Sequence, residues 1–109
     1  MDNNRIIVLI TAPDYETARQ IASRLVEQQL AACANILPGV QSIFRWQGEV
    51  QTESEILLVI KTRRELLHTR LIPEVKALHP YQTPEIIALP VVDGASDYLE
   101  WIDQSTLAE

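Results

Sequence analysis

The stretch NILPGVQSIFRWQGEVQTESEILLVIK, residues 35–61, decides the fold. From Asn35 to Trp46 its residues alternate with a period of two, which is typical of a strand with two unlike faces. Gln47 and Gly48 then supply the positive φ of a tight hairpin turn. The return strand begins polar and becomes apolar over residues 56–61. The pattern predicts one long β-hairpin.

On the amino side of the hairpin, residues 5–11 (RIIVLIT) form an apolar run rich in β-branched side chains. Such a run predicts a strand buried on both faces. Pro13 and Asp14 end this strand, and Asp14 can cap the helix that follows. One face of that helix is apolar with a period of 3.6 residues and consists of Ala18, Ile21, Ala22, Leu25, Val26 and Leu30.

On the carboxyl side of the hairpin, Thr62 and Glu65 have the spacing of a capping box and predict a second helix. Pro73 lies inside this helix and is predicted to kink or restart it, because proline has no amide donor. The inner face of the helix is predicted to consist of Leu67, Leu71, Val75 and Leu78.

A strand and a helix complete the chain. Residues 84–92 (PEIIALPVV) predict a strand, and Pro90 places it at an edge or a bulge. A last helix over residues 96–106 is expected to bury Leu99, Ile102 and Trp101. The order predicts an α+β protein with one domain, residues 1–109. We expect a ferredoxin-like βαββαβ sandwich with a long β-hairpin and a C-terminal helix.

Composition and charge exclude several classes of protein. The hydrophobic fraction is 47% with three glycines, which argues against disorder. A net charge of −6 argues against nucleic-acid binding, since that binding depends on clustered Lys and Arg. No apolar run approaches the ~20 residues that span a bilayer. The single cysteine agrees with a reducing compartment, and we expect a cytoplasmic protein with no membrane partner.

The length of the hairpin predicts association between copies of the chain. A strand of about fourteen residues spans roughly 45 Å, whereas a domain of this size has a radius of gyration of about 13 Å. The hairpin must therefore bend at Leu37 to Gly39 or project from its domain. Phe44 and Trp46 near its tip are costly to leave in water, and a neighbouring subunit would cover them.

Four segments closely resemble the CutA family of divalent-cation-tolerance proteins. They are TAPDYETARQIASRLVEQQLAACANILPGVQSIFRWQGEV (11–50), KT (61–62), HPYQTPEIIALPV (79–91) and YLEWI (98–102). The resemblance covers about residues 8–102, and its motifs AACANI, W-x-G and HPY-x-x-PEI are specific. It implies a ferredoxin-like subunit in a tight homotrimer, with copper binding and tolerance of divalent cations. The family shares its trimeric plan with the PII signalling proteins, so a ligand sensor is the alternative.

Chain direction places the candidate metal ligands at opposite ends of the sheet. One end should bring together Ile10, Thr11, Asp14, His79, Tyr81 and Glu85. Cys33, Asn35 and Lys61 should lie at the other end, so Cys33 and His79 should not share a metal within one protomer. The surroundings of Cys33 are all small residues, which favours a buried thiol packed in the core.

The candidate copper site depends on soft or imidazole ligands. Some relatives have a cysteine just before TAPD and two consecutive histidines before PY, where this chain has Ile10 and Leu78. Only His79 remains there, which predicts at most weak binding of Cu²⁺ or another divalent cation. In the alternative interpretation, His79 ends its helix and bonds to nearby backbone.

A second candidate site is a cleft between subunits. Trp46, Lys61, Tyr81 and Glu85 could line it, and small ligands tend to bind in such concavities. The alternative is plain interface packing with an ion pair. Glu53 and Glu55 are expected to form a polar hairpin face, and His68 to be solvated. We expect no enzyme, because no nucleophile–base pair is evident.

Overall fold

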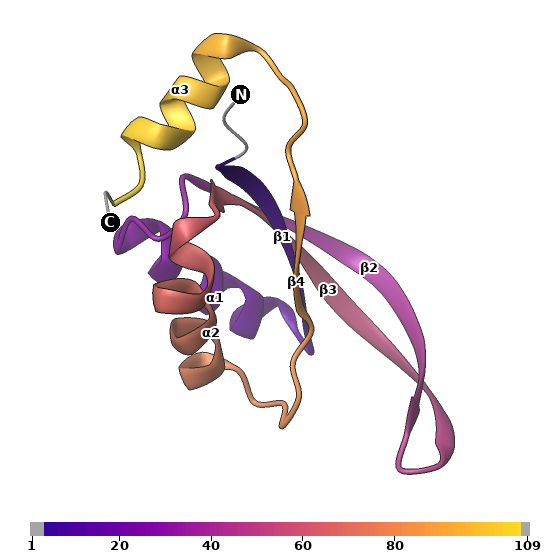
Figure 1. Cartoon of the computed structure of the whole chain (residues 1–109). Helices are drawn as coiled ribbons and strands as arrows, with labels where there is room; N and C mark the ends of the chain where they lie inside the picture. The colour runs from indigo at the N-terminus through magenta and orange to yellow at the C-terminus, as the bar shows by residue number, and fades with distance from the viewer. Residues whose placement is uncertain (1–3, 108–109) are drawn as a thin grey trace.

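The computed structural model describes residues 4–107 as an antiparallel four-stranded sheet with helices (Figure 1). The strand order is β2-β3-β1-β4, which is the order of a ferredoxin-like sheet and confirms the predicted fold class. The elements, in chain order, are β1 (Arg5–Ala12), α1 (Tyr15–Glu27), β2 (Cys33–Trp46), β3 (Glu49–Arg63), the π-helix η1 (Leu67–Leu71), α2 (Ile72–Leu78), β4 (Ile86–Pro90) and α3 (Ser96–Gln104).

The core lies between one face of the sheet and the helices α1 and α2. Ile6, Val8 and Ile10 of β1 are buried in it, together with residues of both helices. Ile7 and Leu9 alternate with them on the opposite face and are only half-buried. The expectation that β1 is buried on both faces is therefore wrong for a single chain, because α1 and α2 cover the same face of the sheet.

Helix α1 begins where the sequence predicts. The Asp14 side chain accepts a hydrogen bond from the Thr17 amide at 2.8 Å and caps the helix. Val26 is exposed and does not belong to the inner face. Leu30 is buried although the helix has ended, because the chain turns inward at Gln29, whose φ is 59°.

The predicted capping box at Thr62 is wrong. Thr62 is still part of β3, whose ladder with β1 continues to Arg63. The Thr62 hydroxyl is buried and donates to the carbonyl of Leu30 at 2.7 Å. It therefore connects β3 to the segment after α1 and does not cap a helix. Glu65 accepts from Arg63 at 2.7 Å.

The second helix restarts near Pro73, as predicted. A π-helical turn, η1, precedes α2, and Pro73 occupies the first turn of α2. Proline cannot donate to the preceding turn, and it fits the start of a helix, where no donor is needed. Leu71 and Val75 are fully buried in the core.

Strand β4 lies at one edge of the sheet, where the predicted position of Pro90 is tolerated. Helix α3 then packs back with Ile102 buried, whereas Leu99 is half-buried and Trp101 is exposed, contrary to expectation. Trp101 instead packs against Tyr98, with ring centroids 5.4 Å apart. Among the described residues, no helix is long and apolar enough to cross a membrane.

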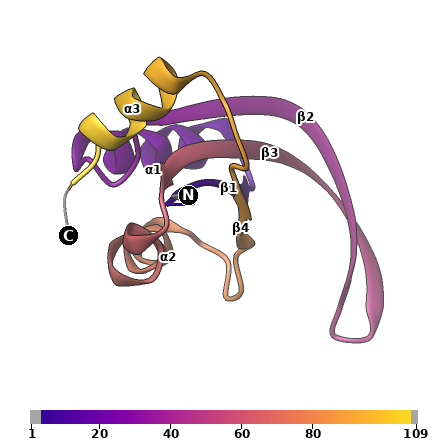
Figure 2. The same ribbon diagram turned by 45° about the horizontal axis from the view of Figure 1, so that its top comes forward.

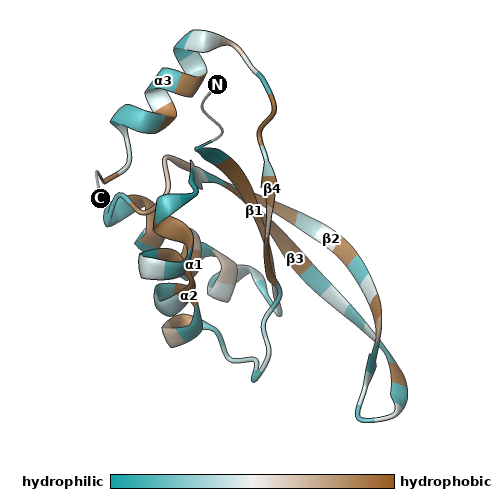
Figure 3. Ribbon diagram, viewed as in Figure 1, coloured by the Kyte–Doolittle hydropathy of each residue, from teal (hydrophilic) through white to brown (hydrophobic). Residues whose placement is uncertain are grey.

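The hairpin of β2 and β3 bends and also projects from the domain (Figure 2). The register shifts between Leu37 and Val40, where Gly39 has a φ of 85°, so the bend lies where it was predicted. Gln47 and Gly48 both have positive φ and form the turn. The described chain measures 44 × 25 × 23 Å. Along the projecting hairpin, hydrophobic residues alternate with hydrophilic ones (Figure 3).

Candidate functional site

His79 is held at the end of α2 by two hydrogen bonds. Its backbone is extended, its side chain is 7% exposed, and its Nε2 lies 2.7 Å from the carbonyl oxygen of Thr11. The Tyr81 amide donates to Nδ1 at 3.2 Å. A carbonyl can only accept and an amide can only donate, so Nε2 carries the proton and Nδ1 is the acceptor. The interpretation of His79 as a helix-ending residue bonded to backbone is confirmed.

This geometry limits what His79 can offer a metal ion. An imidazole coordinates through a nitrogen lone pair, and the one lone pair of this tautomer already accepts from Tyr81. Coordination would require that bond to open. Within residues 4–107, moreover, no three His, Cys, Asp or Glu side chains are grouped closely enough to hold a metal ion.

Tyr81 connects His79 to a carboxylate on the hairpin. The two rings lie 4.7 Å apart, and the Tyr81 hydroxyl donates to Glu55 Oε2 at 2.7 Å. Burial and the bond to Glu55 raise the pKa of Tyr81 above its usual value, with smaller contributions from the charges of Glu53 and Asp14. Tyr81 therefore remains a neutral donor well above neutral pH.

Sequence reasoning missed the role of Glu55. The polar hairpin face was predicted to include both Glu53 and Glu55, but only Glu53 is exposed, and Glu55 is 6% exposed. The reason is that the loop carrying Tyr81 covers Glu55. The ladder between β1 and β3 ends at Ile56, so Glu55 is the first residue of β3 beyond it, and no local sequence pattern marks where that ladder stops.

The end of the sheet that carries His79 is largely as predicted. Thr11, His79 and Tyr81 meet there, and Asp14 is close enough for its charge to act on Tyr81. Glu85 lies in the same loop just before β4, but its side chain is exposed. The acidic partner of Tyr81 is thus Glu55 and not Glu85.

The opposite end of the sheet brings together Cys33, Asn35 and Lys61, as predicted. The Lys61 ammonium donates to Asn35 Oδ1 and lies 3.9 Å from Cys33 Sγ. Cys33 is half-buried rather than buried, because it begins β2, an edge strand, opposite Lys61. Helix α3 adds Tyr98, whose pKa is raised by burial and by the neighbouring Cys33 thiol. Sequence reasoning did not place Tyr98 there.

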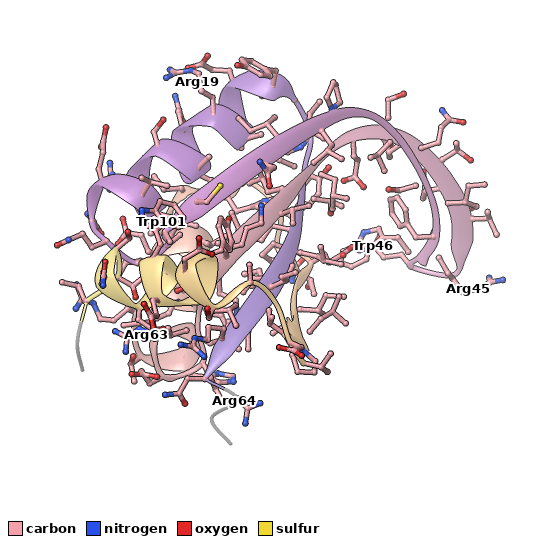
Figure 4. All side chains as sticks on the ribbon, turned by 90° about the horizontal axis from the view of Figure 1, so that it is seen from above. Arg19, Arg45, Trp46, Arg63, Arg64 and Trp101 are labelled. Atoms are coloured by element: carbon pink, nitrogen blue, oxygen red, sulfur yellow. The ribbon has the colours of Figure 1, made fainter. Side chains whose placement is uncertain are left out.

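The four residues of the predicted cleft do not converge within one protomer. Trp46 lies at the end of the hairpin, far from Arg19 on α1 and from Trp101 on α3 (Figure 4). Lys61 and Tyr81 lie at opposite ends of the sheet and have partners of their own. The cleft therefore stays a prediction about assembled subunits, as does the assembly itself.

Two hollows lie on α1, away from these candidate residues. One, of about 370 Å³, is lined by Ala22, Ser23, Val26, Glu27, Ala34 and Ile36. The other, of about 400 Å³, is lined by Arg19, Gln20, Ser23, Arg24, Glu27 and Leu78. Neither contains a residue of the predicted cleft or a predicted metal ligand.

Comparison with known proteins extends the resemblance seen in the motifs. Residues 6–105 match the family described as CutA1 divalent ion tolerance protein. The divalent-cation tolerance protein CutA of Thermus thermophilus is 53% identical over 100 residues, which cover 92% of this chain and 96% of that protein. The chloroplastic protein CutA of Arabidopsis thaliana is 48% identical over 93% of this chain, but the match spans only 55% of that longer protein.

Solved structures agree with these matches. The CutA1 structure from Thermus thermophilus superposes with a TM-score of 0.91 at 52% identity and covers 94% of this chain and 98% of its own. That of CutA1 from Oryza sativa gives 0.93 at 45% identity, with 98% and 97% covered. Fold and site define a ferredoxin-like α+β protein with a projecting hairpin. The chain belongs to the CutA1 family of divalent ion tolerance proteins.

Proposed function

We propose that this protein acts in divalent-cation tolerance as a homotrimer that binds copper or another divalent cation weakly. Membership of the family supports the general role. The observation that carries the proposal of assembly is the large apolar surface that a single chain leaves uncovered. The proposal includes no catalysis, and it places the protein in the cytoplasm.

The uncovered surface combines the hairpin with part of the sheet face opposite α1 and α2, which α3 covers only at the end near Arg5 and Cys33. In β4, Ile87 is 53% exposed and Leu89 is 48% exposed. They pair with Leu9 and Ile7 of β1, respectively. On the hairpin, Ile43 is 72% exposed. Large apolar side chains that stay exposed, as these do on β4 and on the hairpin, often mark an interaction site.

Unpaired strand edges support the same proposal. Within the described part of the chain, the sheet ends in β2 on one side and β4 on the other, and neither strand has a partner on its outer edge there. A neighbouring copy could cover the hairpin and pair with these edges at once. The family resemblance implies three copies.

Sedimentation at micromolar concentration tests the assembly. We expect a mass of about 37 kDa, three times the 12.3 kDa chain. A mass of one chain under these conditions would overturn the proposal. A mass of two chains would leave association standing but reject the trimer.

The proposed metal site uses His79. The negative charges that raise the pKa of Tyr81, those of Glu55, Glu53 and Asp14, make this end of the sheet favourable for a cation. Because binding must displace the Tyr81 amide from Nδ1, we expect weak affinity.

Calorimetric titration with Cu²⁺ tests the metal proposal. We expect His79→Ala to abolish the weak binding and Cys33→Ser to leave it unchanged, since the two residues lie at opposite ends of the sheet. Undiminished affinity in His79→Ala would reject the assignment. Loss of affinity in Cys33→Ser would transfer the site to the thiol.

The second candidate function is a PII-like sensor with a ligand cleft between subunits. One observation favours it: the Lys61 ammonium donates to Asn35 and lies 3.9 Å from Cys33 Sγ, and no carboxylate within residues 4–107 forms an ion pair with it. Its charge is thus available for an anion held with Trp46, Tyr81 and Glu85 of assembled subunits. Heat on titration with ATP, abolished by Lys61→Met, would favour this candidate over metal binding.

A further inference from the structure

The root of the hairpin lies at Glu55. The ladder between β1 and β3 ends at the pair Ala12↔Ile56, so Glu55 is the first residue of β3 beyond the reach of β1. Opposite Glu55, β2 shifts register between Leu37 and Val40. At this point the four-stranded sheet becomes a two-stranded ribbon.

A short loop crosses this root. Residues 79–85, which we call the strap, run from the end of α2 to the start of β4 (Figure 1). Strand β4 pairs with β1 only as far as Ile10. The next carbonyl, that of Thr11, lies 2.7 Å from His79 Nε2 in the strap. Beyond the end of β4, the strap therefore supplies the hydrogen-bond partner for the backbone of β1.

The strap contacts the ribbon through a single described hydrogen bond, from the Tyr81 hydroxyl to Glu55 at 2.7 Å. Glu55 is 6% exposed, and a carboxylate removed from water needs a donor. Beyond Glu55, residues 49–54 pair only with β2. An isolated two-stranded ribbon is weakly constrained, so the contact at its root has a strong influence on its direction.

We propose that Tyr81 is a positioning residue for the hairpin. By holding Glu55 it sets the direction in which the ribbon leaves the domain, and this preorganises the hairpin for a second copy of the chain. Preorganisation strengthens association because less ordering is left to occur on binding. The consequence for assembly rests on the proposed homotrimer, whereas the effect on hairpin direction does not.

The first experiment measures hairpin direction in solution. Spin labels at Glu49→Cys near the turn and Gln20→Cys on α1 report the distance between hairpin and domain, in a Cys33→Ser background that leaves no other thiol. Both sites are exposed. Labelled chains are diluted with unlabelled ones so that distances within one chain dominate. We expect Tyr81→Phe to broaden the distance distribution. This variant keeps the aromatic ring and the hydrogen bond from the backbone amide of residue 81 to His79.

Tyr15→Phe is the matched control, because it removes an exposed hydroxyl from the start of α1. We expect it to leave the distribution unchanged. Glu55→Gln keeps an acceptor oxygen and should also retain a narrow distribution. Glu55→Leu removes the acceptor and should broaden it as Tyr81→Phe does, with no further broadening when the two are combined. A distribution that stays narrow in both Tyr81→Phe and Glu55→Leu would overturn the inference.

The second experiment measures exchange of subunits between isotope-labelled and unlabelled protein by mass spectrometry. We expect Tyr81→Phe to speed exchange roughly tenfold, the scale that one hydrogen bond to a charged group can supply. Tyr15→Phe should exchange at the wild-type rate. If the wild type is trimeric and Tyr81→Phe exchanges at the same rate, the proposed effect of the strap on assembly is rejected. The proposed effect on hairpin direction is not. A monomeric wild type would instead reject the proposed trimer and leave the distance measurement to decide on hairpin direction.

Discussion

At the scale of single residues, a chain of hydrogen bonds organises the end of the sheet where β1 stops. It runs from the Thr11 carbonyl through His79 and the Tyr81 amide, and from the Tyr81 hydroxyl to Glu55. Each donor faces an acceptor, so the network is satisfied without water. Buried networks of this kind are costly to break, because each lost partner leaves a polar group unpaired.

The network predicts that His79 contributes to stability. We expect His79→Ala to lower the free energy of unfolding by about 2 kcal/mol, because it leaves both the Thr11 carbonyl and the Tyr81 amide without a partner. His68→Ala is the matched control, since His68 is exposed and should change stability little. Urea unfolding at one fixed protein concentration measures both. Equal effects of the two variants would contradict this role for His79.

The raised pKa of Tyr81 predicts a dependence of stability on alkaline pH. A phenol whose pKa is higher in the folded state stabilises the protein fully below the pKa of the unfolded state, which is near 10.0, and loses that effect as pH rises further. The advantage of the wild type over Tyr81→Phe should therefore be constant below about pH 10 and shrink above it. Unfolding by urea between pH 8 and pH 11 would show this, and a constant difference throughout would contradict it.

At the scale of elements, the hairpin depends on two places where the backbone leaves ordinary strand geometry. One is the turn at Gln47 and Gly48, and the other is the bulge at Gly39. Nothing lies within 4 Å of a Cβ built on either glycine, so space does not require glycine there. The positive φ does, because a Cβ makes that conformation costly for other residues.

The turn predicts a difference between two substitutions at Gly48. We expect Gly48→Ala to cost about 1 kcal/mol of stability through its φ of 83°, and Gly48→Asn to cost less, since asparagine tolerates the left-handed region better. Thermal unfolding at fixed concentration compares the variants. If alanine and asparagine proved equally harmless, the turn in solution would differ from the one described.

At the scale of the whole molecule, a compact α+β domain carries a projecting hairpin that the rest of the described chain leaves largely uncovered. The same chain leaves Ile87 and Leu89 exposed on the face of the sheet opposite α1 and α2. Leaving both groups of apolar side chains in water is unfavourable for a single domain. The association of copies that we propose would cover both features.

The projecting hairpin predicts that Trp46 acts through assembly. Trp46 is 42% exposed in the single chain, so much of this large aromatic side chain is left for a neighbouring copy to cover. We expect Trp46→Ala to lower the Tm more at low protein concentration than at high concentration, because loosened subunits dissociate on dilution. Val92→Ala serves as a control, since Val92 is highly exposed and lies outside the hairpin. A shift that is the same at all concentrations would show that Trp46 stabilises the protomer instead.

The sequence by itself determined the elements that local patterns encode. The 3.6-residue period of α1, the cap at Asp14, the turn at Gln47-Gly48 and the restart at Pro73 all depend on residues close in the chain. The meeting of Thr11, His79 and Tyr81 followed from strand direction alone. Short-range periodicity, backbone sterics and the βαββαβ order are sufficient for such predictions.

Only the tertiary structure decided which polar groups are buried and bonded. Thr62 looked like a cap but bonds to Leu30, and Glu55 looked like a solvated hairpin residue but is covered by Tyr81. Cys33 looked like core but lies half-buried beside Lys61 and Tyr98. These outcomes depend on contacts between segments distant in sequence, and on how far each strand continues. A local pattern carries no information on either, because hydrogen bonding and burial are set by what packs across the fold.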